Sequence, residues 1–336
     1  MATTRPCRRW CGRFAEPTRG FRWSAGLEAG TAGNIGRPLC DVALASDPPD
    51  WLALELSSFQ LHDTPNLRPA IGVLTNLAPN HLDRYPRLEE YYGDKARLFR
   101  NADSDSVWIS NADDAAVRRM VADVSGTHLR FSLERRADGW YDRPRASLMV
   151  GETPLMPRAE LPLLGDHNVA NALAAALAAV RAGGDPARVA AGLRTFRAIP
   201  HRVEPVREVD GVLWINDSKS TNITSTEVAV AALDRPFVLL LGGRHKGEPY
   251  TRLAAPLRGR CRAVVAYGEA GPQVVRDLGG SLTVVAAGDF ADVLARARGL
   301  ARPGDAVLLS PACSSYDMFK NYEERGARFR AAVEAM

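Results

Sequence analysis

The sequence has few cysteines, and their spacing excludes two kinds of structure. Five cysteines are spread over 336 residues, at positions 7, 11, 40, 261 and 313. An odd, scattered set does not form a disulfide framework, and Cys7 and Cys11 have no nearby Cys or His partners to complete a zinc site. This cysteine usage is typical of a reducing compartment, so we expect a cytoplasmic protein.

Long apolar runs and a strong excess of one charge are also absent. No run approaches the ~18 residues that a membrane span requires, because the Ala-rich stretch 169–180 is short and interrupted by Asn171. The Arg-rich N-terminus lacks the apolar core of a secretory signal. The net charge is only +4, and no basic stripe with interleaved aromatics is present. We therefore expect a monomer that binds small molecules rather than nucleic acid or a membrane.

The composition and length indicate a globular chain of two domains. Hydrophobic residues make up 46% and charged residues 24% of the sequence, which is ordinary for a globular protein of this size. A predicted helix ends near Arg197, and Pro200 breaks the chain there. We therefore predict domains at 1–198 and 199–336. Residues 1–28 are rich in Arg, Trp and Cys without a regular period, so we predict irregular structure there.

The first domain shows short apolar runs and helical spacing in alternation. A strand ending in polar residues is predicted within 51–60, a second strand at 70–76, and a strand that leads into a turn over 106–114. A helix is predicted at 87–99 and short antiparallel strands over 118–159. A further helix is predicted from an N-cap at Asp166 to Arg181, where Gly183 and Gly184 end it.

The second domain repeats a strand–helix pattern typical of parallel βαβ units. Strands are predicted at 212–216, 237–241, 263–267, 282–285 and 306–310, with helices ending at 233 and spanning 290–301. Polar clusters follow three of these strands, at 217–222, 242–246 and 311–315. In open α/β sheets ligands bind outside the carboxyl ends of the strands, so these clusters are candidate binding loops.

Three ionisable residues of the first domain are candidates for a magnesium–phosphate site. Glu55 and His81 lie at or just beyond strand ends, and Lys95 lies on the next helix. Mg²⁺ prefers oxygen ligands and keeps waters and substrate phosphates, which suits a carboxylate at a sheet edge. Taken singly, however, such a Glu is commonly a solvated loop charge, and a lone His more often caps or packs.

Cations and hydroxyls of the second domain form another candidate site. Lys219 and Lys246 follow two strands and can neutralise phosphate or carboxylate charge, although a lone loop Lys is usually only solvated. Hydroxyls that can hydrogen-bond a carboxylate are present at Thr221, Ser314 and Ser315. Cys313 has no neighbouring His or acid in sequence to activate it, so we do not predict a nucleophile there.

Two asparagines begin the helix that is predicted from Asp166. Asn168 and Asn171 are three residues apart and share one face of the first turn. They could be simple caps, or they could meet a nucleotide at the positive end of the helix.

Three segments carry a resemblance to a known family. Glu-Leu-Ser-Ser-Phe-Gln-Leu (55–61), Asn-His-Leu-Asp-Arg (80–84) and Asp-Lys-Ala-Arg-Leu-Phe (94–99) resemble the central domain of the Mur ligases. The similarity is greatest to the members that add D-glutamate, runs from about Gly33 to the end, and covers two of the three family domains. It implies an α/β fold: an incomplete central ATP-binding domain, then a Rossmann-like C-terminal α/β domain.

The resemblance also implies a reaction. Family members of this kind use ATP and Mg²⁺ to join D-glutamate to UDP-N-acetylmuramoyl-L-alanine through an acyl phosphate, in peptidoglycan synthesis. The segment Ser-Pro-Ala-Cys-Ser-Ser-Tyr-Asp-Met-Phe-Lys (310–320) favours D-glutamate over larger amino acids. Other Mur ligases and folylpolyglutamate synthetase share the central motifs and are the alternatives within the enzyme class.

Site roles implied by the resemblance fall into four groups. Mg²⁺ would be bound by Glu55, His81 and, if carbamylated, Lys95. ATP would be bound by Asn168, Asn171, Arg202 and Asp217. Lys95, His81 and Lys219 would be catalytic. Substrate would be bound by Asn34, Ser57, Gln60, Thr221, Lys246, Ser314, Ser315 and Tyr322. The family position before His81 often bears Asp, whereas this chain has Asn80.

One family motif is missing from the sequence. The family has a Gly-x-Gly-Lys-Thr/Ser phosphate loop on the first strand of its central domain, and no Gly-Lys-Thr or Gly-Lys-Ser occurs here. We therefore expect that first strand to be lost, Met1 to follow a frameshift or misplaced start, and residues 1–336 alone to be inactive. The alternatives are an active ligase or a non-catalytic binding remnant. A dinucleotide oxidoreductase ranks lower, because no Gly-x-Gly-x-x-Gly lies between a strand and a helix.

Overall fold

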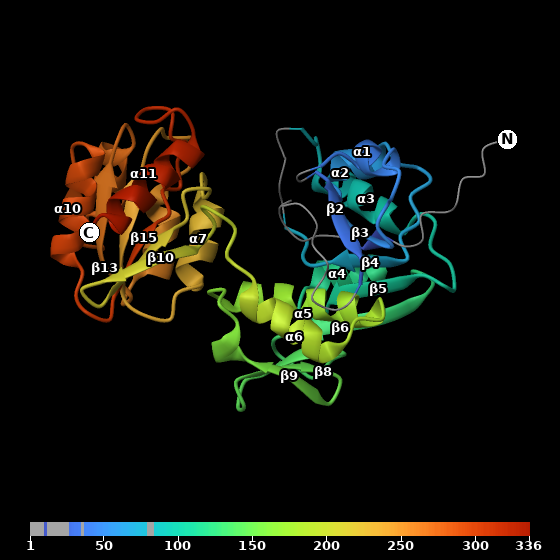
Figure 1. Ribbon diagram of the computed structural model, residues 1–336. Coiled ribbons are helices and arrows are strands. Elements are labelled where there is room, and N and C mark those ends of the chain that lie inside the picture. Colours follow the sequence, from blue (N-terminus) through green and yellow to red (C-terminus); the bar gives the residue numbers. More distant parts are fainter. Residues whose placement is uncertain (1–9, 12–26, 35–36, 79–83) are drawn as a thin grey trace. The chain divides into compact units, whose positions relative to one another are not determined.

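The computed structural model describes residues 10–11, 27–34, 37–78 and 84–336. They form two compact units (Figure 1). Unit 1 consists of Met1–Pro162 and Asp166–Phe196, and unit 2 of Leu163–Gly165 and Arg197–Met336. Each unit contains one β-sheet with its own helices, so each is described by itself.

Unit 1 is built on a mixed sheet whose described strands follow the order β2-β3-β1-β4-β5-β6-β7-β8-β9. The pairs from β2 to β7 are parallel, and β7, β8 and β9 pair antiparallel. The strands are β1 (Trp10–Cys11), β2 (Ala29–Gly33), β3 (Trp51–Glu55), β4 (Ile71–Leu74), β5 (Val107–Asn111), β6 (Thr127–Ser132), β7 (Gly139–Asp142), β8 (Ser147–Val150) and β9 (Thr153–Pro157).

Helices bury apolar side chains against this sheet. They are α1 (Leu39–Ala43), α2 (Ser58–His62), α3 (Leu88–Ala96), α4 (Ala115–Val121), α5 (Asp166–Arg181) and α6 (Pro186–Thr195), with 3₁₀ turns η1 (Arg97–Phe99) and η2 (Arg158–Glu160). The longest, α5, contacts β4 to β8 and buries Val169, Leu173 and Leu177. Each such side chain contributes about 1.5–3 kcal/mol, so α5 is a main source of stability in unit 1.

The strands predicted within 51–60, at 70–76 and within 106–114 and the helix at 87–99 are confirmed, although the first strand ends at Glu55 and Ser58–His62 forms α2. The prediction that the first strand is lost is wrong for the described residues. Trp10–Cys11 forms β1, which pairs in parallel with both β3 and β4. Most of the predicted irregular stretch 1–28 lies outside the described residues.

The prediction of antiparallel strands over 118–159 is correct only for its second half. Residues 115–121 form α4 because the Asp114 side chain caps it, accepting from the backbone N–H groups of Ala116 and Val117. β6 pairs in parallel with β5 and β7. Asp166 is the first residue of α5 rather than its N-cap, and its carboxylate accepts from Arg143 Nη2 at 2.8 Å.

Unit 2 has a largely parallel sheet in the order β10-β11-β15-β12-β13-β14. Only β10 among the described strands of this sheet is antiparallel, to its neighbour β11. The strands are β10 (Glu204–Val209), β11 (Val212–Asn216), β12 (Phe237–Gly242), β13 (Cys261–Tyr267), β14 (Val284–Ala286) and β15 (Ala306–Leu309). The predicted α/β class is confirmed, and β10 is an addition to the predicted strands.

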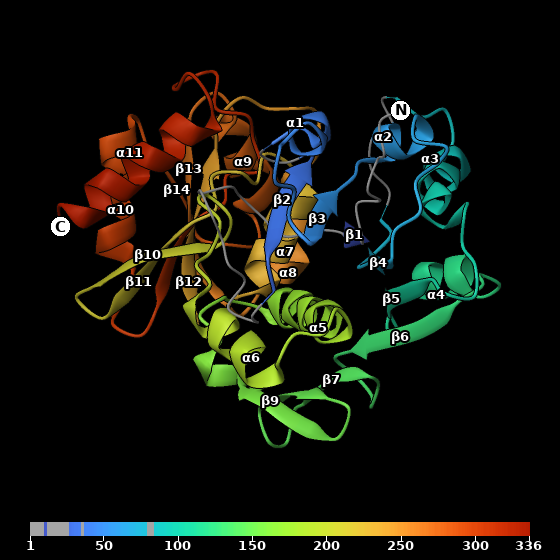
Figure 2. The same cartoon turned by 45° about the vertical axis from the view of Figure 1, so that its right-hand side comes forward.

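Helices cover both faces of the unit 2 sheet (Figure 2). They are α7 (Ile223–Ala231), η3 (Tyr250–Leu253), α8 (Ala254–Leu257), α9 (Gly271–Leu278), α10 (Phe290–Leu300) and α11 (Tyr322–Glu334). Along β12, Phe237 and Leu239 enter the core with α7, α8 and α9, whereas Val238 and Leu240 enter the core with α10 and α11. Burial on both faces explains why β12 reads as a continuous apolar run.

The end of β2 requires glycine. Gly33 has a φ of +112°, and an added Cβ would lie 2.1 Å from the backbone oxygen of Glu55. We predict that Gly33→Ala lowers the free energy of unfolding by about 3 kcal/mol or more, from backbone strain plus steric overlap. Gly183 is the control, since its φ is +99° but an added Cβ would meet nothing within 4 Å. Gly183→Ala should cost only about 1–2 kcal/mol. Equal losses in urea denaturation would contradict the role of the Glu55 contact.

Candidate active site

The ends of β2 and β3 bring two predicted site residues together. Gly33 and Glu55 are register partners, and the backbone N–H of Asn34 donates to the Glu55 carbonyl at 2.9 Å. Asn34 is exposed and Glu55 half-buried. Both residues thus lie at the carboxyl edge of the sheet, where an α/β fold binds ligands.

Ser57 and Gln60 have a local structural role. The Gln60 N–H donates to Ser57 Oγ at 3.2 Å, and the Ser57 N–H donates to Gln60 Oε1 at 3.0 Å. This reciprocal pair is a capping box at the start of α2. It fixes the chain immediately after Glu55, and a substrate contact by either side chain stays a prediction.

Helix α3 presents Lys95 beside a hydrogen-bonded carboxylate. Lys95 is half-buried, with its Nζ 5.9 Å from the centroid of the Tyr91 ring. The neighbouring Asp94 accepts from His62 at 2.8 Å, Tyr85 at 3.0 Å and Arg97 at 2.8 Å. Burial raises the pKa of Asp94, but these hydrogen bonds outweigh burial and hold the pKa below its ordinary value. Asp94 therefore stays ionised and ties α3 to α2.

The structure describes two of the three predicted magnesium ligands, Glu55 and Lys95. His81 and Asn80 lie outside the described residues. Among the residues that are described, no cluster of three or more His, Cys, Asp or Glu could hold a metal. A single carboxylate such as Glu55 fits Mg²⁺ when phosphate oxygens and water complete the shell.

The start of α5 places its two asparagines side by side. Asn171 Nδ2 lies 3.4 Å from Asn168 Oδ1, as expected for residues three apart on a helix. Burial lowers the pKa of the adjacent His167, so this turn carries a neutral imidazole near neutral pH.

In unit 2, the loop after β11 buries an unusual acid. Asp217 is 3% exposed, and its carboxylate accepts from the Val203 N–H at 3.1 Å and from Ser310 Oγ at 2.7 Å. Burial raises the pKa of Asp217 to about 6, although hydrogen bonds from Ser220, Ser310 and Val203 act in the opposite direction. The acid joins the ends of β11 and β15. Its predicted contact with ATP would require the carboxylate to exchange these hydrogen-bond partners for the nucleotide.

Lys219 is held over an aromatic ring. Its Nζ lies 4.0 Å from the centroid of Tyr322, a cation–π geometry. The backbone carbonyl of Tyr322 accepts from Ser218 Oγ at 2.8 Å, and the Lys219 N–H donates to the His201 carbonyl at 3.0 Å. The structure therefore brings Lys219 and Tyr322 together, as the site hypothesis requires.

The loops after β12 and β15 are paired. The Arg244 N–H donates to the Ser314 carbonyl at 2.9 Å, and Ser314 Oγ donates to the Arg244 carbonyl at 3.3 Å. Lys246 is exposed two residues further on. In the same unit Thr221 is half-buried and Arg202 exposed, whereas Ser315 is buried.

Sequence reasoning missed the buried residues that support these loops. Arg325 is completely buried; its guanidinium donates to Ser218 Oγ at 2.9 Å, the Ser218 carbonyl at 2.7 Å and the Cys313 carbonyl at 3.2 Å. Asn216 donates to His201 Nδ1 at 3.0 Å and to the Gly326 carbonyl at 3.2 Å. The sequence signal that could have indicated this role is the position of Arg325, three residues after Tyr322 and on the inner face of α11.

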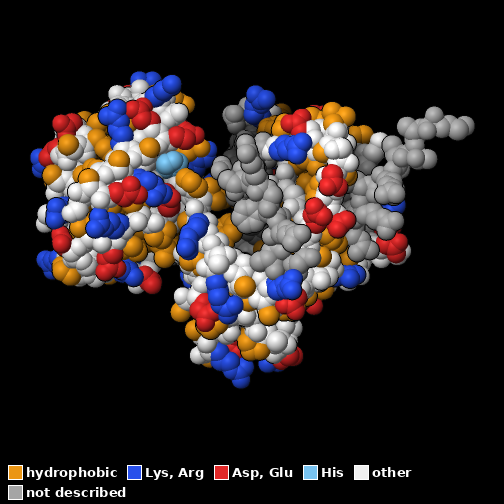
Figure 3. Space-filling view, viewed as in Figure 1, with side chains coloured by type: hydrophobic (Ala, Val, Ile, Leu, Met, Phe, Trp, Pro, Cys, Tyr) orange, Lys and Arg blue, Asp and Glu red, His pale blue; other side chains and the backbone are white. Residues whose placement is uncertain are grey.

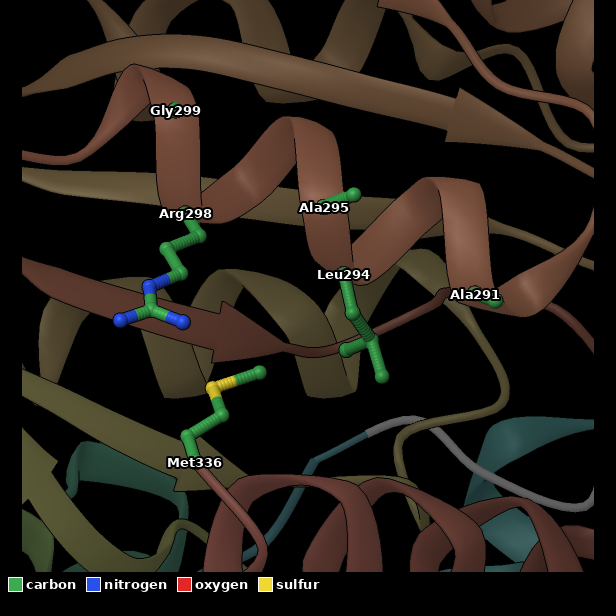
Figure 4. A pocket seen from close by; sticks show the side chains of 6 residues that line it. All are labelled: Ala291, Leu294, Ala295, Arg298, Gly299 and Met336. Atoms are coloured by element: carbon green, nitrogen blue, oxygen red, sulfur yellow. The ribbon is translucent and has the colours of Figure 1, made fainter.

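Two surface features of the described residues concern charge on one face and a pocket in unit 2. On the face shown in Figure 3, acidic and basic side chains are interspersed over the described parts. One pocket is lined by residues of α10 and by Met336 (Figure 4). Its lining is mostly apolar, and its Arg298 is already paired with Asp210 at 2.7 Å. The lining consists of Ala291, Leu294, Ala295, Arg298, Gly299 and Met336. Among the described residues, no helix is both long and apolar enough to cross a membrane.

The raised pKa of Asp217 predicts how the free energy of unfolding depends on pH. Between its ordinary value of 3.8 and about 6, the folded state retains a proton that the unfolded state has lost, so Asp217 makes stability fall as pH rises through this window. Asp217→Asn removes this term while keeping an acceptor for Val203. We predict that the unfolding free energy of the variant minus that of the parent rises from pH 4 to 6 and is constant above. A flat difference in denaturant titrations at several pH values would contradict the assignment.

Comparisons with known proteins identify the family of this chain. The Mur ligase middle domain matches residues 17–179, and the Mur ligase glutamate ligase domain matches residues 201–313. UDP-N-acetylmuramoylalanine–D-glutamate ligase of Salinibacter ruber is 41% identical over 327 residues, covering 94% of this chain and 71% of the relative. The enzyme of the same name from Myxococcus xanthus is 41% identical over 316 residues, covering 90% and 69%.

Solved structures show the same fold at low sequence identity. A crystal structure of MurF from Acinetobacter baumannii has a TM-score of 0.68 and 15% identity, covering 98% of this chain and 77% of that one. MurF ligase from Thermotoga maritima, solved in complex with ADP, has a TM-score of 0.64 and 17% identity, covering 92% and 74%. The matched domains and the 41% identity show that this chain belongs to the Mur ligase family of ATP-dependent, amide-bond-forming ligases.

Proposed function

We propose that this chain acts on D-glutamate and UDP-N-acetylmuramoyl-L-alanine, as the names of its curated relatives state for those proteins. The observation that carries the proposal is the cluster of cations and hydroxyls after β11, β12 and β15 of unit 2. A monomer in the cytoplasm, using small-molecule substrates, is part of the same proposal.

The unit 2 cluster suits a dicarboxylic amino acid. D-Glutamate carries two carboxylates, and the ammonium groups of Lys219 and Lys246 can each make a charge-assisted hydrogen bond. Thr221, Ser314 and Ser315 supply hydroxyls for the remaining carboxylate oxygens. Because Tyr322 lies under the Lys219 ammonium, it limits the directions in which that cation can point.

We assign the nucleotide and metal to the remaining site residues. Residues 1–198 would form the ATP- and magnesium-binding domain and residues 199–336 the ligase domain. Asn168, Asn171, Arg202 and Asp217 would contact ATP. Glu55, together with His81 and a carbamylated Lys95, would hold Mg²⁺, which when bound would neutralise phosphate charge.

In the proposed reaction, the alanyl carboxylate of the muramoyl substrate first receives the γ-phosphoryl group of ATP, and ADP leaves. The D-glutamate amine then attacks the acyl carbon, phosphate leaves, and the nitrogen loses a proton as the amide forms. Asn34, Ser57 and Gln60 would orient the muramoyl substrate. The chain's contribution is mainly positioning and electrostatic stabilisation of negative charge.

Loss of Lys246 should weaken D-glutamate binding. Removing one partner of a charge-assisted hydrogen bond costs about 1.5–3 kcal/mol, so Lys246→Ala should raise the dissociation constant about tenfold or more. The control is Arg276→Ala, which removes an exposed cation on α9 of the same unit. Calorimetric or NMR titrations with D-glutamate, and with L-glutamate as a stereochemical control, measure both. Equal affinities of Lys246→Ala and parent would reject the assignment.

A binding protein without ligase activity is the second candidate function. The specific observation in its favour is that no Gly-Lys-Thr or Gly-Lys-Ser occurs in the sequence. A phosphate loop uses successive backbone N–H groups and a Lys under the phosphates, and Lys219 and Lys246 lie in the other unit.

A product assay separates the two candidates. Residues 1–336 are incubated with ATP, Mg²⁺, UDP-N-acetylmuramoyl-L-alanine and D-glutamate, and the dipeptidyl product and released phosphate are measured by mass spectrometry and colorimetry. Formation of the dipeptidyl product with release of phosphate is the result that the proposed ligase function requires, whereas D-glutamate binding without product would support the binding protein. Robust turnover would establish the ligase and show that another segment binds the phosphates.

A further inference from the structure

Three side chains of unit 2 are joined by hydrogen bonds and connect the loops that follow β12 and β15. His245 Nδ1 lies 3.1 Å from Tyr250 Oη, and Tyr250 Oη lies 2.8 Å from Cys313 Sγ. His245 is half-buried, Tyr250 is 1% exposed, and Cys313 is completely buried. The chain therefore runs from the edge of the β12 loop into the core below the β15 loop.

The two ends of this chain are next to proposed substrate residues. His245 precedes Lys246, and Cys313 precedes Ser314. The backbone joins the same two loops at Gly242, whose N–H donates to the Pro311 carbonyl at 3.1 Å. It joins them again through the pairing of Arg244 with Ser314. The hydrogen bonds of His245, Tyr250 and Cys313 link the same two loops a third time. This link passes through η3, whose first residue is Tyr250.

Burial keeps two of the three groups, Tyr250 and Cys313, in their protonated forms. Burial raises the pKa of the Cys313 thiol to about 11 and raises the pKa of Tyr250 well above its ordinary value. Both groups keep their protons at neutral pH, so the thiol is a poor nucleophile. The Tyr250 hydroxyl can then donate to His245 Nδ1 while its oxygen accepts from the Cys313 S–H.

We propose that His245, Tyr250 and Cys313 are positioning residues that hold Lys246 and Ser314 at the spacing required by a substrate carboxylate. The proposal rests on the proposed function of unit 2. Because Tyr250 is the central member with two hydrogen bonds, removing its hydroxyl should release both loops. His245 and Cys313 belong to the two substrate loops, and Tyr250 of η3 contacts both of them. None of the three is assigned a catalytic role.

Tyr250→Phe tests the central member in the full chain. D-Glutamate affinity should fall about tenfold, equivalent to about 1.4 kcal/mol. The matched control is Tyr267→Phe, since Tyr267 is as buried and its hydroxyl, although near the Arg325 guanidinium, makes no hydrogen bond of normal geometry among the described residues. The control should stay within about twofold of the parent in affinity.

His245 provides a conservative rescue. His245→Ala removes the acceptor and should weaken D-glutamate binding as Tyr250→Phe does. His245→Asn keeps an acceptor, because the Asn side-chain oxygen lies near the position of Nδ1, and should retain affinity close to that of the parent. A merely structural effect of losing the ring would affect both His245 variants equally and would overturn the proposal.

A second readout does not require substrate. The rate at which N-ethylmaleimide labels Cys313 is measured by peptide mapping, with Cys261 of β13 as internal reference. Tyr250→Phe and His245→Ala should accelerate labelling at Cys313 about fivefold or more relative to Cys261, because the loops separate more often.

The outcomes separate this inference from the proposed function. If the parent does not bind D-glutamate, the proposed function fails. The labelling rates alone then decide whether His245, Tyr250 and Cys313 hold the two loops together. If the parent binds D-glutamate but Tyr250→Phe binds it equally well, the positioning role is overturned whatever the labelling shows. Weaker binding by Tyr250→Phe and His245→Ala, with rescue by His245→Asn, supports it.

Discussion

The buried guanidinium of Arg325 is the constraint on which the candidate site of unit 2 depends. A charge removed from water is costly unless its donors are satisfied, and Arg325 finds oxygens on Ser218 and Cys313. These two residues precede Lys219 and Ser314. The need to solvate one cation therefore fixes two loops that are 95 residues apart in sequence, Ser218 to Cys313, and places their polar side chains at one edge of the sheet.

Glycine and small-residue contacts complete the same arrangement. An added Cβ on Gly243 would lie 2.3 Å from the Ser314 carbonyl, and one on Gly326 would lie 2.1 Å from His201 Nδ1. Close backbone approach thus brings the β12 loop onto the β15 loop and brings α11 onto the loop that carries His201. The site is specified as much by the absence of side chains at these positions as by the residues that would touch a ligand.

The sequence predicts elements whose signal is local and misses features set by distant partners. β12 was predictable because Phe237–Gly242 is buried on both faces and is a continuous apolar run. The parallel pairing of β6 was not, because its direction depends on β5 and β7. Lys219 and Lys246 could be selected from their places after strands, whereas the burial of Asp217 depends on Ser310, 93 residues later.

The parallel pairing of β2 with β3 has a consequence for amide exchange at this edge of unit 1. The two strands match residue for residue, from Ala29 with Trp51 to Gly33 with Glu55. Asn34 extends the pairing, because its N–H donates to the Glu55 carbonyl. The two candidate site residues therefore belong to one hydrogen-bonded unit. A ligand held by either residue would slow amide exchange in both strands.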